Sequence, residues 1–132
     1  MRYSVLIVDD DEDDRNLFRY GFEQNKIGDV GVFNDAYDVL YYLSSVATVL
    51  PKLIVSDFNM PTLSGLELLQ SLKKSDLLKT IPFIIFSTYT PVTQVAKCMQ
   101  SGALGYHQKP SSLEEVVKVV KQIIQPIFAE KQ

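Results

Sequence analysis

The 132-residue sequence has no tryptophan and only one cysteine, Cys98. A single cysteine has no partner for a disulfide within the chain, which favours a reducing compartment. No apolar run approaches the roughly 20 residues needed to cross a bilayer. The first strand-like segment begins directly after Ser4, too early for the apolar stretch of a signal peptide. We therefore expect a cytoplasmic protein that does not associate with membranes.

The sequence also has no excess of positive charge. Its formal net charge is −3 and its pI is about 5.1, and it has no basic stripe, so we expect no nucleic-acid partner. Hydrophobic residues make up 46% of the chain, which is enough to build a core in a domain of this length. No linker, repeat or low-complexity tract interrupts it. These features predict one domain over residues 1–132, with no second domain.

Strand-like and helix-like segments alternate regularly along the chain. Apolar, strand-like segments occur at about 5–8, 29–33, 53–57, 82–86 and 105–108. Amphipathic segments with helical spacing follow them, at about 12–25, 36–46, 65–72, 91–101 and 113–127. Near-continuous apolar strands that alternate with amphipathic helices predict an α/β fold, in which helices cover both faces of a parallel sheet.

Capping residues mark the start of three predicted helices. Asp11 is expected to cap the first, whose opening acids, up to Asp14, lie where the helix dipole favours negative charge. Asn34 or Asp35 is expected to cap the second helix. Ser64, followed three residues later by a glutamate, has the spacing of a capping box at the start of the third.

Polar side chains follow four of the strand-like segments. Asp9 and Asp10 come after the first, Asp57 ends the central one, Ser87 ends the fourth and Lys109 follows the fifth. The carboxyl ends of parallel strands share one edge of a sheet, where binding sites form. Three carboxylates close together repel one another and would also repel an anionic phosphoryl donor, so the cluster requires a cation. Mg²⁺ suits such a site because it prefers oxygen ligands. The pattern favours a phosphoryl-acceptor site.

Four segments at these strand ends form a characteristic set: VLIVDDDEDD, LIVSDFNMPTLSG, FIIFST and GALGYHQKP. They resemble the signature segments of the receiver domain of bacterial response regulators, the CheY-like family, in the same order and at the same spacing. The resemblance covers essentially the whole chain. It implies a stand-alone receiver with a five-stranded parallel sheet in the order 2-1-3-4-5 and helices on both faces, the flavodoxin-like (βα)5 fold.

The same resemblance implies two-component phosphorelay signalling rather than an enzyme of metabolism. Asp57 would accept a phosphoryl group from a sensor histidine kinase or a histidine phosphotransfer protein, forming an aspartyl phosphate. Asp10 and Asp57 would bind Mg²⁺, or Mn²⁺, directly, and Asp9 would act mostly through water. Asn59 would contribute its backbone carbonyl to the metal. The protein would catalyse only its own phosphorylation and dephosphorylation.

Three further residues complete the site in the family pattern. Lys109 would balance the phosphoryl charge, and Ser87, rather than the adjacent Thr88, would donate a hydrogen bond to a phosphoryl oxygen. The ring of Tyr106 would turn inward on activation, with a statically packed tyrosine as the alternative. To aim Lys109 back into the site, we predict a cis bond to Pro110, against a prior of ~5% for such bonds.

Two other protein classes share parts of this pattern. Aspartate-nucleophile hydrolases of the haloacid dehalogenase class need a second acid two residues after the nucleophile, where this chain has Asn59, and they carry a cap domain. Flavin or nucleotide binders of the same fold need a Gly/Ser-rich loop where this chain has DDDEDD, which repels phosphate. We therefore prefer a phosphorylation-switched signalling domain. A phosphate-relay intermediate and a phosphorylation-independent protein-binding module are the alternatives.

The output surface is expected to consist of the fourth helix, the fifth strand and the fifth helix. It would bind a downstream protein target, or a second copy of the chain after phosphorylation. Pro126 is expected to kink or end the last helix, because it has no N–H to donate. A kink would turn Phe128 toward a partner; a Phe128 folded back onto its own domain is the alternative.

Overall fold

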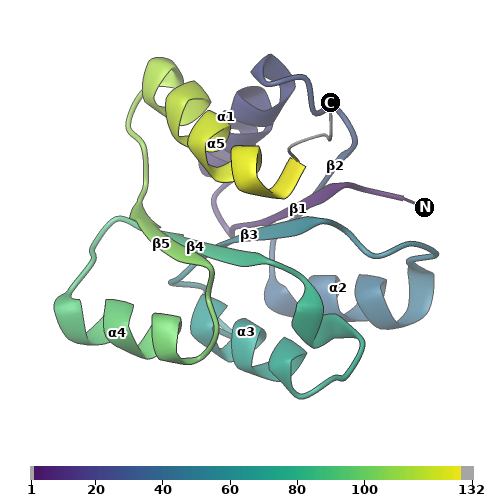
Figure 1. The fold of residues 1–132 in the computed structure, drawn as a ribbon. Helices are drawn as coiled ribbons and strands as arrows, with labels where there is room; N and C mark the ends of the chain where they lie inside the picture. Colours follow the sequence, from purple (N-terminus) through teal and green to yellow (C-terminus); the bar gives the residue numbers. More distant parts are fainter. Residues whose placement is uncertain (1, 129–132) are drawn as a thin grey trace.

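The computed structural model describes residues 2–128 and has a parallel sheet between two layers of helices (Figure 1). The strands are β1 (Val5–Val8), β2 (Val30–Phe33), β3 (Leu53–Asp57), β4 (Phe83–Ser87) and β5 (Gly105–Gln108). Their order in the sheet is β2-β1-β3-β4-β5, and every neighbouring pair is parallel. The predicted α/β fold and strand order are confirmed.

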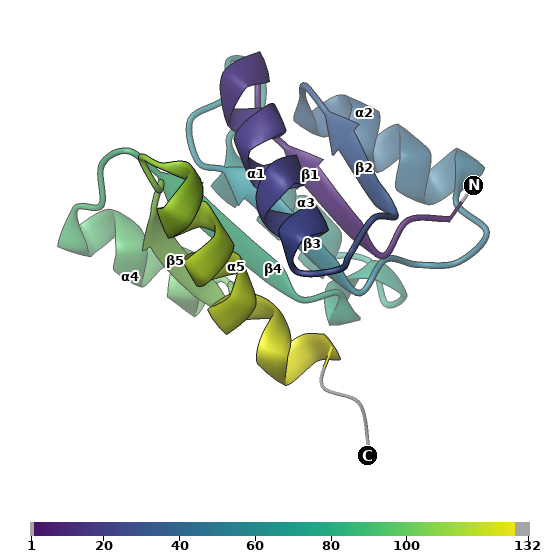
Figure 2. The same cartoon turned by 90° about the horizontal axis from the view of Figure 1, so that it is seen from above.

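The helices cover both faces of this sheet. They are α1 (Glu12–Gln24), α2 (Ala36–Tyr41), α3 (Gly65–Lys73), α4 (Val92–Gln100) and α5 (Leu113–Phe128). Helices α1 and α5 lie on one face and α2, α3 and α4 on the other (Figures 1 and 2). A π-helix, Tyr42–Val46, continues α2 to the predicted end of that segment, and a 3-10 turn, Leu78–Thr80, follows α3. Among residues 2–128, no helix has the length and apolar character of a membrane span.

Side-chain caps fix the start of three helices. The Asp11 carboxylate accepts a hydrogen bond from the first turn of α1, and Asp35, rather than Asn34, does the same for α2. At α3 the Ser64 hydroxyl and the Glu67 carboxylate form both bonds of a capping box. These caps satisfy backbone N–H groups that have no partner within the helix. The predicted caps are confirmed.

Strands β1, β3 and β4 are buried along their whole length. Alternate residues of each strand face opposite sides, so the core consists of two clusters. One lies under α2, α3 and α4 and includes Leu6, Ile54 and Ile85. The other lies under α1 and α5 and includes Val5 and Val55. Burial on both faces explains why these strands are almost continuously apolar.

Helix α5 does not end at its proline. It continues through Pro126 to Phe128, so the helix does not end at Pro126, which was one of the two predicted outcomes, and a kink there stays a prediction. Because Pro126 has no N–H, the carbonyl of Gln122, four positions earlier, lacks its usual helical hydrogen bond. Both residues are exposed, so water can bind that carbonyl instead. Phe128 packs back against the core cluster under α1 and α5, and the Lys52 Nζ lies 5.5 Å from its ring centroid. Phe128 therefore does not project toward a partner.

Candidate functional site

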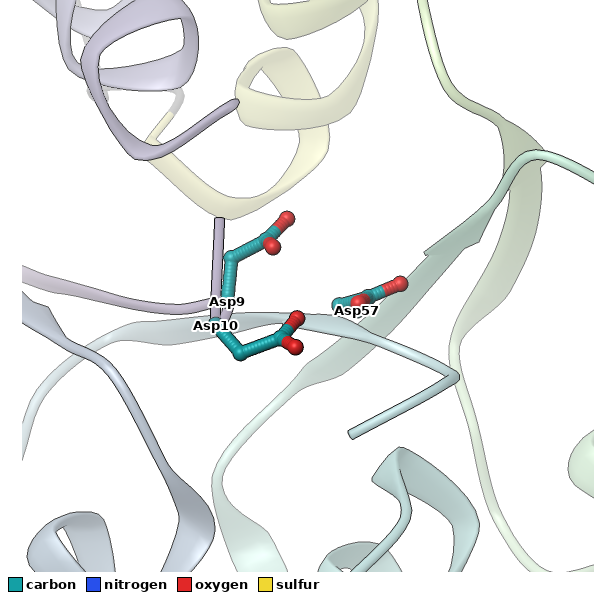
Figure 3. A group of neighbouring side chains, drawn as sticks. All are labelled: Asp9, Asp10 and Asp57. Carbon is teal, nitrogen blue, oxygen red and sulfur yellow. The ribbon is translucent and has the colours of Figure 1, made fainter. Parts of the chain in front are cut away.

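The three predicted acids meet at the carboxyl edge of the sheet. Asp9 and Asp10 follow β1, and Asp57 ends β3 (Figure 3). One carboxylate oxygen from each lies within 4.8 Å of those of the other two. Asp9 is 2% exposed and Asp57 7% exposed, whereas Asp10 is open to solvent. The group is thus a mostly buried carboxylate cluster with one side accessible to a cation.

The turn after β1 holds Asp9 in place through its own backbone and side chain. The Arg15 guanidinium donates a hydrogen bond to the Asp9 carbonyl oxygen at 2.8 Å. The backbone N–H of Asp11 donates to Asp9 Oδ1 at 3.0 Å. The start of α1 therefore orients the Asp9 carboxylate, and leaves its second oxygen for another partner.

The loop after β3 holds Asp57 in a similar way. The Phe58 N–H donates to the Phe86 carbonyl of β4 and the Gly65 N–H donates to the Phe58 carbonyl, each at 2.9 Å. Gly65 packs so closely on β3 that a Cβ there would overlap the Asp57 carbonyl oxygen. The N–H of Asn59 lies 3.4 Å from Asp57 Oδ1. The start of α3 is therefore set directly against the aspartate.

Lys109 enters the cluster from the loop after β5. Its backbone N–H donates to the Ser87 carbonyl at 2.8 Å, which fixes this loop beside the end of β4. None of the described peptide bonds is cis, so the predicted cis bond between Lys109 and Pro110 is wrong. The physical reason is that this backbone bond already places the residue, and the flexible four-carbon stem spans the remaining distance without a sharper turn.

The Lys109 ammonium contacts three carboxylates. Its Nζ lies 2.6 Å from Asp14 Oδ2, 2.9 Å from Asp9 Oδ2 and 3.4 Å from Asp57 Oδ1. The Asp14 contact was not predicted, because the acids at the start of α1 are explained by the helix dipole alone. A signal was present: Asp14 has the helical spacing of the buried residues Phe18 and Phe22, so it continues the inward stripe of α1.

The buried charges perturb one another. Burial, and then the charge of Asp9, raise the pKa of Asp57 from 3.8 to about 6. Burial also raises the pKa of Asp9. Burial alone would lower the pKa of Lys109, but its hydrogen bonds to Asp14 and Asp9 raise that pKa above its ordinary value. One ammonium therefore faces more negative charge than it can neutralise, which suits the cluster to a divalent cation.

Of the two adjacent hydroxyls at the end of β4, only one is buried. Ser87 is 0% exposed and Thr88 is exposed. The Ser87 Oγ accepts a hydrogen bond from the Tyr89 N–H at 3.2 Å. In the register of the sheet Asp57 pairs with Phe86, so Ser87 lies one residue closer to the edge where the acids meet. Geometry thus favours Ser87 over Thr88 as the hydroxyl of the site.

Tyr106 links β5 to the segment that precedes α4. Its hydroxyl donates to the Tyr89 carbonyl oxygen at 3.1 Å and accepts a bond from the Gln94 side chain. Its half-buried ring lies 6.3 Å from the ring of Phe58, centroid to centroid. These contacts fasten the β4–α4 loop to β5. This loop begins directly after Ser87, the last residue of β4, and the inward turn of the Tyr106 ring on activation stays a prediction.

Comparisons with known proteins cover nearly the whole chain. The family model of the response regulator receiver domain matches residues 5–121. "Two-component response regulator ORR8" of Oryza sativa subsp. indica is 32% identical over 119 residues, which is 90% of this chain and 96% of that protein. An uncharacterised 14.6 kDa protein of Leptolyngbya boryana is 31% identical over 118 residues, 89% of this chain and 87% of that protein.

Solved structures agree on the fold. The receiver domain of Francisella response regulator 1452 matches with a TM-score of 0.76 at 30% identity, covering 95% of this chain and 98% of that one. The Mn²⁺-bound form of response regulator Rcp1 matches with a TM-score of 0.83 at 22% identity, covering 98% of each chain. Both similarities cover nearly the whole of each chain.

Proposed function

Because the chain belongs to the response regulator receiver family and has the acidic pocket typical of a phosphoacceptor site, we propose that Asp57 is the residue that accepts the phosphoryl group. The observation that carries this proposal is the convergence of Asp9, Asp10 and Asp57 within 4.8 Å at the edge of the sheet. Asp57 is the member at the end of the central strand, in contact with Lys109. The protein is a signalling domain, so its output is a change in binding rather than a released product.

Transfer would proceed by attack of an Asp57 carboxylate oxygen on the donor's phosphorus. A bond forms between that oxygen and phosphorus, and the bond from phosphorus to the donor's imidazole nitrogen breaks. Lys109 Nζ, 3.4 Å from Asp57 Oδ1, would donate to a phosphoryl oxygen as negative charge collects there. The buried Ser87 hydroxyl would supply a second hydrogen bond to the phosphoryl group.

The acidic triad can bind a metal ion, and we propose Mg²⁺, with Mn²⁺ as a substitute. Its fit rests on three carboxylates within 4.8 Å, one of them open to solvent, with Asp57 bearing a raised pKa. Asp10 and Asp57 would bind the ion directly, Asp9 through water, and Asn59 through its backbone carbonyl. When bound, the ion would neutralise charge on the phosphoryl oxygens. The Mn²⁺ in the Rcp1 structure supports a divalent ion at such a site.

A two-component regulator has a histidine kinase as its partner. The finer proposal is that a phosphohistidine, on a kinase or a phosphotransfer protein, is the donor, and that the face formed by α4, β5 and α5 binds the target. Exposed apolar side chains support this surface: Tyr89 is 70% exposed, Val92 83% and Leu104 53%. A second copy of the chain is an alternative occupant, but Phe128, packed on its own core, would not contribute to it.

Intact mass spectrometry after incubation with acetyl phosphate and Mg²⁺ tests the proposed acceptor. The wild-type chain should gain one phosphoryl group, and chelation of the metal should prevent the gain. Asp57→Asn should gain none. Asp13→Asn, which removes an exposed charge nearby on α1, should behave like the wild type. A phosphoryl group that persists in Asp57→Asn would show that another residue is the acceptor.

A further inference from the structure

The Lys109 ammonium has three N–H donors, and three carboxylates surround it. Asp14, Asp9 and Asp57 lie at 2.6, 2.9 and 3.4 Å from its Nζ. The lysine side chain is only 10% exposed, which leaves little space for water as a competing acceptor. The shortest of the three contacts is therefore made by an α1 residue that does not belong to the acidic triad.

Asp14 differs from the other two partners in one respect. Asp9 and Asp57 belong to the group of carboxylates that could hold a metal ion, and Asp14 does not. In the proposed reaction Asp57 becomes an acyl phosphate, and Asp9 shares its charge with the cation. Asp14 is the one partner of Lys109 whose carboxylate is not needed by the metal or the phosphoryl group. Its bond to the lysine can persist through the reaction.

Asp14 also occupies a fixed position. It lies on the first turn of α1 and is 29% exposed at its side chain. Phe18, one turn further along the same stripe, is buried, and its ring packs edge-on against Phe86 of β4 at 4.7 Å. The helix is thus anchored to the strand that leads into Ser87. The contact with Lys109 joins this helix to a loop 95 residues away in the sequence.

We propose that Asp14 is a positioning residue that holds the Lys109 ammonium so that its remaining N–H is directed at the phosphoryl group on Asp57. A lysine side chain has high conformational entropy, so a partly buried, charge-assisted bond on one side restricts where its other donors point. Asp14 therefore acts through Lys109 and not on the phosphoryl group itself. This inference rests on the function proposed above and deepens it.

The test compares initial phosphorylation rates in acetyl phosphate and Mg²⁺, followed by intact mass. Asp14→Asn should be slower than the wild type by roughly tenfold, about the effect of losing one charge-assisted hydrogen bond. Asp13→Asn is the matched control, because it removes the same charge from the same turn at an exposed position. Asp13→Asn should keep the wild-type rate. Asp14→Glu, which keeps the carboxylate, should retain most of it.

A double-mutant cycle with Lys109→Gln separates positioning from a structural effect. If Asp14 acts through the ammonium, Asp14→Asn should cause no further loss once Lys109 is Gln. A further loss in that background, of the size seen with Lys109 present, would overturn the inference, as would an Asp14→Asn rate equal to or above that of Asp13→Asn. An Asp14→Glu protein that folds yet is as slow as Lys109→Gln would also contradict it. Wild-type protein that accepts no phosphoryl group would instead refute the proposed function.

Discussion

Replacing Asp57 by Asn should stabilise the metal-free protein at neutral pH. The Asp57 carboxylate is 7% exposed and lies beside the charge of Asp9. Its one cation partner, Lys109, is 3.4 Å away and closer to two other carboxylates. Asn has nearly the same shape without the charge. The substitution therefore removes an unfavourable buried charge and leaves the packing of β3 intact.

The size of the effect follows from the pKa of Asp57. Burial, and then the Asp9 charge, raise this pKa from 3.8 to about 6, so the folded chain binds a proton there more tightly than the unfolded chain does. The free energy of unfolding of the wild type therefore falls as the pH rises from about 4 to about 6, and stays lower above that. At roughly 1.4 kcal/mol per pH unit, the cost at neutral pH is about 3 kcal/mol. Asp57→Asn should therefore raise the free energy of unfolding at neutral pH by roughly 2–3 kcal/mol.

Urea denaturation in a chelating buffer measures this difference. Because the chain has no tryptophan, unfolding is best followed by circular dichroism. The gain in Asp57→Asn should be present near neutral pH and absent below about pH 4, where Asp57 is protonated in both states. Asp13→Asn controls for the loss of one negative charge. Added Mg²⁺ should stabilise the wild type by mass action and Asp57→Asn much less.

An Asp57→Asn protein that is less stable than the wild type near neutral pH would contradict this prediction. Such a result would mean that the contact with Lys109 stabilises the fold by more than the burial of the Asp57 charge costs. A gain of the same size at every pH would also contradict it, because the predicted cost arises only where Asp57 is ionised.

Three other predictions concern the metal, a glycine and the cysteine. In calorimetric titration with Mg²⁺, Asp10→Ala should weaken binding more than Asp9→Ala, since Asp10 is the proposed direct ligand; equal losses would refute this order. Gly65→Ala should lower the free energy of unfolding by roughly 1–3 kcal/mol, because a Cβ there overlaps the last carbonyl of β3. Gly28→Ala, whose Cβ would meet no atom within 4 Å, is its control in thermal unfolding. Cys98 is 0% exposed and burial raises the pKa of its thiol. A thiol reagent should therefore label it only after denaturation. Rapid labelling of the folded protein would contradict the packing of α4.

Much of the fold follows from periodic features of the sequence. Strand β1 is apolar throughout and β3 is apolar up to Ser56 because helices cover both faces, and the amino-acid sequence alone displays that pattern. The convergence of Asp9, Asp10 and Asp57 follows from one topological rule, that parallel strands bring their carboxyl ends to the same edge.

The features that the sequence does not reveal depend on side-chain directions and on long-range contacts. Asp14 has two explanations, as a charge favoured by the helix dipole and as an inward-facing acid, and only the contact with Lys109 distinguishes them. Proline is strongly disfavoured in a helix interior, but Pro126 is exposed, so water can replace the missing backbone hydrogen bond at little cost in free energy. The packing of Phe128 near Lys52 joins residues too distant in sequence for any local pattern to indicate.

The most direct test of the account is to locate the phosphoryl group within the chain. Borohydride reduces an aspartyl phosphate to homoserine, and trypsin then releases the peptide between Lys52 and Lys73, in which Asp57 is the only aspartate. We expect homoserine in this peptide after treatment with acetyl phosphate and Mg²⁺, and none without the metal. Homoserine in the peptide that carries Asp9 and Asp10, or in neither peptide, would contradict it.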